Sequence, residues 1–108
     1  MEDKFAEVLV ELQAMHDRKG SDYDKDEIPY FNIRGSSEWG VAPWIGAMVR
    51  ANDKIKRLQK YATRGSLKNE SVEDSLLDLA VYSIIALILW REMHATSREL
   101  ELMSKAYA

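Results

Sequence analysis

Apolar side chains recur every three or four positions near the start of the chain, between residues 4 and 18. This spacing places five of them on one face of a helix: Phe5, Val8, Leu9, Leu12 and Met15. Residues 44–64 show the same spacing, and Gly65 follows directly, as is typical of the position just after a helix. The pattern therefore predicts two amphipathic helices.

A third helix is predicted to begin near residue 71, because Ser71 and Asp74 resemble a capping box, and to reach at least Glu92. Its centre is the longest apolar run in the chain, LAVYSIIALILW, which fills residues 79–90. A helix that crosses a membrane needs roughly 20 such residues, so this shorter run predicts a buried helix. The remaining residues, 93–108, either continue this helix or form a fourth one.

Residues 19–43, between the first two helices, contain Gly and Pro too often for a long helix. Five of the chain's ten aromatic residues fall within positions 23–44. Since a solvated linker does not need them, we expect a long ordered loop whose aromatic side chains pack against the helices. The alternative for Tyr30 or Trp39 is a platform on which a nucleobase stacks.

No stretch alternates between apolar and polar residues with period two, as a half-buried strand would. The predicted fold is therefore all-α, a small bundle of three to four helices. At 108 residues and 12.4 kDa, the chain is expected to form a single domain over residues 1–108.

Net charge and amino-acid composition indicate which kinds of partner are not expected for this chain. The chain has 15 Lys and Arg against 18 Asp and Glu, so no overall basic field favours nucleic acid or a membrane surface. The absence of Cys excludes disulfides and thiolate metal sites, and it fits a reducing compartment. The first residues lack the order of a secretory signal. We expect a cytoplasmic protein with no membrane or nucleic-acid partner.

A row of cations follows one face of the helix predicted over residues 44–64. At 100° per residue, five side chains fall within roughly 80° of arc: Arg50, Lys54, Arg57, Tyr61 and Arg64. The row lies beside the apolar stripe, so its stems can pack while its charged ends line a groove suited to phosphate. The alternative is a solvated basic face, or one paired with acidic groups of a neighbouring helix.

Three carboxylates, Glu70, Asp74 and Asp78, recur at intervals of four residues near the start of the third helix. Asp78 has apolar neighbours on both sides in the sequence, so we expect it to be buried and to have a partner. One alternative is an ion pair with Lys54 or Arg57. The other is a Mg²⁺ ion shared with substrate phosphates, because Mg²⁺ prefers hard oxygen ligands.

Three short elements, read in order, resemble a known family. They are residues 19–23 (KGSDY), residues 53–58 (DKIKRL) and residues 69–82 (NESVEDSLLDLAVY). Over about residues 15–90 the chain resembles the phage and bacterial nucleotide modification associated domain of type 1. That domain is in turn similar to the MazG-like, all-α nucleoside triphosphate pyrophosphohydrolases.

The resemblance implies a MazG-like helical bundle in which helix carboxylates hold Mg²⁺ and water releases pyrophosphate from a nucleotide. Asp78 matches the last residue of the family's E-x-x-D motif. The chain departs from the family where Lys54 and Arg57 replace the acidic residues of E-x-x-E. It departs again where Ser75 replaces the Glu of E-x-x-D and where Val81 replaces an Asn.

The first functional hypothesis is a pyrophosphohydrolase that acts on (deoxy)nucleoside triphosphates with Mg²⁺. Asp74 and Asp78 are its expected catalytic residues, and with Glu70 they are its expected metal ligands. The residues expected to bind substrate are Lys19, Asp22, Tyr23, Arg50, Lys54, Arg57 and Tyr82. Two alternatives stay open: a non-catalytic nucleotide- or phosphate-binding module, and a helical interaction protein whose charged rows are internal salt bridges. The apolar run in so short a chain also predicts a homo-oligomer.

Overall fold

The computed structural model describes residues 3–23, 30–66, 71–95, 101–102 and 104–105, although not the side chains of residues 19–23 and 31. The described elements are α1 (Lys4–Tyr23), α2 (Phe31–Arg34), the 3-10 helix η1 (Gly35–Trp39), α3 (Pro43–Arg64) and α4 (Val72–His94). No strand occurs among them. The predicted all-α class is confirmed.

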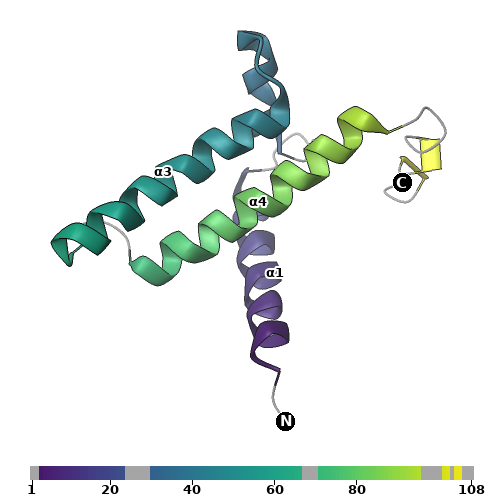
Figure 1. Cartoon of the computed structure of the whole chain (residues 1–108). Helices are drawn as coiled ribbons and strands as arrows, with labels where there is room; N and C mark the ends of the chain where they lie inside the picture. Colours follow the sequence, from purple (N-terminus) through teal and green to yellow (C-terminus); the bar gives the residue numbers. More distant parts are fainter. Residues whose placement is uncertain (1–2, 24–29, 67–70, 96–100, 103, 106–108) are drawn as a thin grey trace.

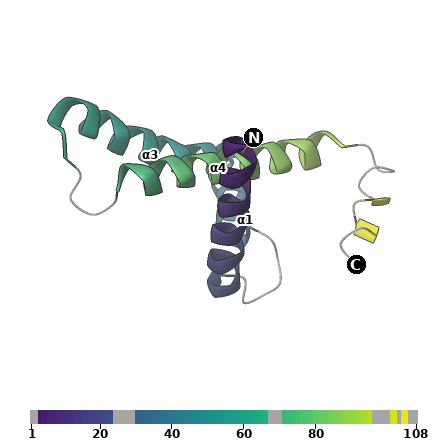
Figure 2. The same ribbon diagram turned by 90° about the horizontal axis from the view of Figure 1, so that it is seen from below.

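Helices α3 and α4 lie side by side and run in opposite directions, whereas α1 crosses them at a steep angle (Figures 1 and 2). The α2–η1 segment packs on the first half of α3. Ala47 and Ala51 of α3 are completely buried. Two side chains this small let α3 and α4 approach closely, which favours a tightly packed helix pair.

Local sequence explains the limits of α3. Pro43 occupies its first turn, where a missing backbone N–H costs nothing. Gly65 follows the helix with φ +76°, and its N–H donates to the Tyr61 carbonyl over 2.7 Å. A residue without Cβ adopts this left-handed conformation at little cost. The predicted helix over residues 44–64 is therefore confirmed, one residue longer at its start.

The limits of α4 also follow from local sequence. The Ser71 hydroxyl accepts a hydrogen bond from the Asp74 N–H over 3.0 Å, as the predicted cap requires. At the other end, Ala95 has extended backbone angles, so α4 stops at His94. Residues 101–102 and 104–105 are helical again. None of the described helices has the length and apolar character needed to cross a bilayer.

The first helix is longer than predicted. The sequence pattern suggested an end after residue 18, but α1 continues through Gly20 to Tyr23. A Gly inside a helix costs about 1 kcal/mol relative to Ala, which weakens the helix without ending it. The connection that follows is correspondingly shorter, and its described part contains α2 and η1.

The hydrophobic core lies where α2 meets the α3–α4 pair. Its buried residues are Ile33, Ala47, Ile85, Ala86 and Leu89, with Tyr30, Trp44, Val81 and Tyr82 packed against them. The expectation that the connection packs against the helices is therefore met by Tyr30 and Ile33. It is wrong for Trp39, which is 87% exposed.

Candidate functional site

Lys54 and Asp78 form an ion pair between α3 and α4. The Lys54 Nζ atom lies 3.0 Å from Asp78 Oδ2, and the two side chains are 16% and 10% exposed. The sequence predicted that Asp78 is buried and has a partner, and both statements are confirmed. The ion pair with Lys54 is one of the alternatives that the sequence left open for that partner.

The helical positions explain why these two groups meet. Lys54 follows Ala47 and Ala51 at intervals of four and three, so all three side chains face α4. Asp78 lies on the buried side of α4 with Ser75 and Ile85. The contact between α3 and α4 is thus apolar near Ile85 and ionic near Asp78.

The other members of the cationic row lie outside this contact. Arg50, Arg57, Tyr61 and Arg64 are exposed on α3, on the flank of the face that carries Lys54. The row is therefore divided. Lys54 pairs with a carboxylate inside the contact between α3 and α4, whereas the three arginines are exposed at its edge.

The predicted magnesium ligands are not brought together in the described part of the chain. Asp74 is exposed on the first turn of α4, Asp78 is bonded to Lys54, and Glu70 lies outside the described residues. Within those residues, no three His, Asp or Glu side chains gather closely enough to hold a metal ion. Since one of the three predicted ligands lies outside the described residues, the Mg²⁺ site stays a prediction.

Ser75 occupies the position where the resembled family has a Glu. It is completely buried, at 0% exposure, one turn before Asp78. A carboxylate at this position would need a partner and more space than a serine occupies. The close packing here thus suits a small side chain rather than a second acidic ligand.

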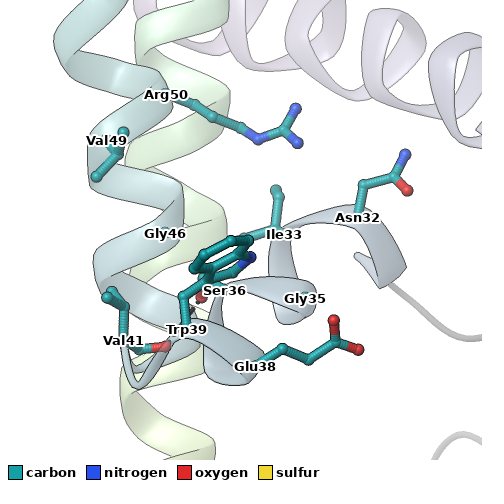
Figure 3. A pocket seen from close by; sticks show the side chains of 10 residues that line it. All are labelled: Asn32, Ile33, Gly35, Ser36, Glu38, Trp39, Val41, Gly46, Val49 and Arg50. Carbon is teal, nitrogen blue, oxygen red and sulfur yellow. Dashed lines mark hydrogen bonds between the residues drawn. The ribbon is translucent and has the colours of Figure 1, made fainter.

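An open pocket of about 470 Å³ lies between the α2–η1 segment and α3. In Figure 3, Arg50 and Asn32 approach it from one side, Glu38 lies on the other, and the Trp39 ring lies between them. Sequence reasoning singled out Arg50 and Trp39 but missed Asn32 and Glu38. The sequence carries no periodic signal for these two, because only the packing of η1 on α3 brings them to the pocket.

Gly46 allows η1 to pack on α3 this closely. A Cβ atom at this position would lie 2.7 Å from Ser36 Oγ and 3.1 Å from the Ile33 carbonyl oxygen. Ser36 is itself held, because its hydroxyl donates to the Val41 carbonyl over 3.1 Å. A glycine inside a predicted helix often marks a close approach, and this signal was present in the sequence.

The remaining predicted substrate-binding residues lie elsewhere. Lys19, Asp22 and Tyr23 belong to the end of α1, and their side chains lie outside the described part of the structure. Tyr82 is half-buried and packs against the hydrophobic core. The described residues that surround the pocket and the ion pair come from α2, η1, the short link between η1 and α3, α3 itself and α4.

A second ion pair, which the sequence did not predict, joins the connection to α4. Arg34 donates two hydrogen bonds to Glu92, with N–O distances of 3.0 and 3.2 Å. The two residues are 58 positions apart, so no local pattern links them. This paired contact fixes α2, and with it the start of η1, against the C-terminal half of α4.

In comparisons with known proteins, the chain matches no protein-family model, no curated protein and no solved structure.

Proposed function

We propose that the protein is a nucleotide-binding module that holds a nucleoside phosphate in the pocket between η1 and α3. Arg50 binds the phosphate groups, and Trp39 stacks on the base. The observation that carries the proposal is the position of an exposed guanidinium and an exposed indole in one pocket.

The phosphate end is assigned to Arg50. A guanidinium offers several N–H donors in a planar arrangement that matches phosphate oxygens. Arg50 lines the pocket and belongs to the same row of α3 as Lys54 and Arg57. Because Lys54 is paired with Asp78, the phosphate contact within this row is assigned to Arg50.

The base end is assigned to Trp39. A side chain of this size normally buries most of its surface, yet Trp39 is 87% exposed. Its ring offers a flat apolar face for stacking, and base stacking on aromatic side chains contributes about 1–3 kcal/mol. Asn32 and Glu38 also line the pocket and supply a donor, an acceptor and a carboxylate for the edge of a base.

Binding without hydrolysis is favoured by the Lys54–Asp78 pair. The Lys54 ammonium lies 3.0 Å from the carboxylate that the hydrolase hypothesis assigns to the metal. It thereby neutralises Asp78 with a charge that belongs to the chain itself. Since Lys54 and Arg57 also replace two acidic residues of the resembled family, the site has lost carboxylates and gained cations.

Calorimetric titration with a panel of ribo- and deoxyribonucleoside mono-, di- and triphosphates tests the proposal. We expect saturable binding to the wild type both with Mg²⁺ and with EDTA. Arg50→Gln and Trp39→Ala should each weaken binding roughly tenfold, which corresponds to about 1.4 kcal/mol. Lys56→Gln is the matched control, because it removes the same charge from another face of α3 and should leave binding unchanged.

The titration has two contrary outcomes. If Lys56→Gln weakens binding as much as Arg50→Gln, the nucleotide senses only the overall charge of α3, and the pocket is wrong. If no nucleotide binds, the binding module is wrong, and a helical interaction protein with internal salt bridges is the better description.

A Mg²⁺-dependent pyrophosphohydrolase is the second candidate. It is favoured by the buried position of Asp78, which matches the last residue of the E-x-x-D motif. Incubation of the same nucleotides with Mg²⁺, followed by assay of pyrophosphate and monophosphate, tests it. Turnover that Asp78→Asn abolishes would establish this candidate in place of simple binding.

A further inference from the structure

Only half of the apolar stripe of α1 is covered by the rest of the chain. Leu12 is buried and Met15 is half-buried, but Phe5 is 75% exposed, and Val8 and Leu9 are also exposed. These five residues share one face of the helix. The N-terminal end of α1 lies clear of the α3–α4 pair (Figure 1), so the stripe extends beyond the surface that covers its second half.

Helix α4 has a second uncovered apolar stripe. Leu76, Ile84 and Leu87 are all exposed, and with Ala80 they fall within roughly 80° of arc. This stripe lies nearly opposite the side of α4 that faces α3. A helix that is apolar on nearly all sides is normally covered on all of them.

We propose that a second copy of this chain covers both stripes. In the resulting two-fold dimer, the first half of α1 from each copy packs on the open stripe of α4 in the other. Each copy carries one stripe on α1 and one on α4. When α1 of each copy packs on α4 of the other, all four stripes are covered, and both copies use the same surface, as an isologous interface requires.

The exposed apolar area fits such a dimer. Six large side chains, between 43% and 75% exposed, carry on the order of 300 Å² of apolar surface per copy. A stable interface buries about 800 Å² per partner, of which a little over half is apolar. The two stripes therefore supply most of the apolar surface that a dimer of ordinary size needs.

Cross-linking tests the arrangement directly, because the natural chain contains no Cys. Leu9→Cys and Ile84→Cys are made as separate variants, one with an added tag, and are mixed and treated with a short bis-maleimide. We expect a cross-linked heterodimer in the mixture and no cross-link in either variant alone. Sedimentation of the wild type should give twice the mass of 12.4 kDa.

A pair of neighbouring substitutions on α1 provides the control. Leu9→Asp should give monomers, whereas Val10→Asp, which is exposed on the other side of α1, should leave the dimer intact. Circular dichroism establishes whether each variant is folded. A monomeric wild type, a cross-link between two Leu9→Cys copies, or equal effects of the two α1 variants would overturn the proposal.

Discussion

The contact between Lys54 and Asp78 replaces water around two charges with a group of opposite charge on the adjacent helix. Removing charges from water costs several kcal/mol per ion, and mutual attraction roughly offsets that cost only while both partners are present. The pair is therefore better understood as a constraint on how α3 and α4 align than as a large source of stability. If either member of this pair is removed, the charge that stays buried destabilises the packing of α3 on α4.

Substitution at these two positions should be strongly non-additive. Lys54→Met leaves Asp78 buried without this partner and should lower the free energy of unfolding by about 3–5 kcal/mol. The double variant Lys54→Met/Asp78→Leu removes both charges and should recover most of that loss. Urea unfolding of the wild type, single and double variants measures both effects.

An exposed lysine on the same helix is the control for this cycle. Lys56→Met should change stability by no more than about 0.5 kcal/mol. If the single Lys54 variant does not fold, a folded double variant still supports the argument. Equal losses in the single and double variants would contradict it.

The packing of η1 on α3 depends on a missing side chain rather than on an attractive contact. Gly46 lowers the intrinsic stability of α3, since Ala is preferred over Gly in a helix by about 1 kcal/mol. However, Gly46 also lets η1 pack closely on α3, and this packing forms one wall of the pocket lined by Trp39 and Arg50. The Arg34–Glu92 contact then holds the preceding α2 against α4.

Gly46→Ala should accordingly destabilise the protein despite the better helix propensity of Ala. The added methyl group meets a hydroxyl and a backbone carbonyl that are held in place, and overpacking of this kind costs about 1–3 kcal/mol. Gly35→Ala is the control, because a Cβ atom there meets nothing within 4 Å. Chemical unfolding compares the two variants, and a Gly46→Ala protein more stable than the wild type would show that η1 can move away freely.

The whole molecule is more extended than a compact domain of this length. Its Cα radius of gyration is 16.0 Å, whereas a compact chain of 108 residues has about 13 Å. Its principal extents are 49 × 43 × 26 Å, as the crossing of α1 over the helix pair implies (Figure 2). A chain with this shape covers less of its apolar surface than one in which α1 lies along α3 and α4.

If a second copy completes this surface, thermal stability should depend on protein concentration. Dimerisation favours the folded state by mass action, so a tenfold increase in concentration should raise Tm by roughly 3–5 °C. Calorimetric scans over that range measure the shift, with Leu9→Asp as a control whose Tm should be constant. A wild-type Tm that does not change with concentration would count against the dimer.

Much of the fold could be predicted from residues that lie close together in the sequence. The three- and four-residue spacing predicted α1 and α3, and Gly65 marked the end of α3. The cap at Ser71 and the apolar run of residues 79–90 predicted α4. The apolar neighbours of Asp78 were enough to predict a buried carboxylate with a partner, because a buried carboxylate without one is energetically costly. These features depend on residues within a few positions of each other, and such information is present in the sequence.

The sequence alone does not determine which segments far apart in the chain come into contact. The Lys54–Asp78 pair, the Arg34–Glu92 contact and the exposure of Trp39 depend on how helices far apart in the sequence align. The same is true of the pocket beside Gly46. Periodicity indicates which face of a helix is apolar, but only the packed chain determines which neighbour that face meets.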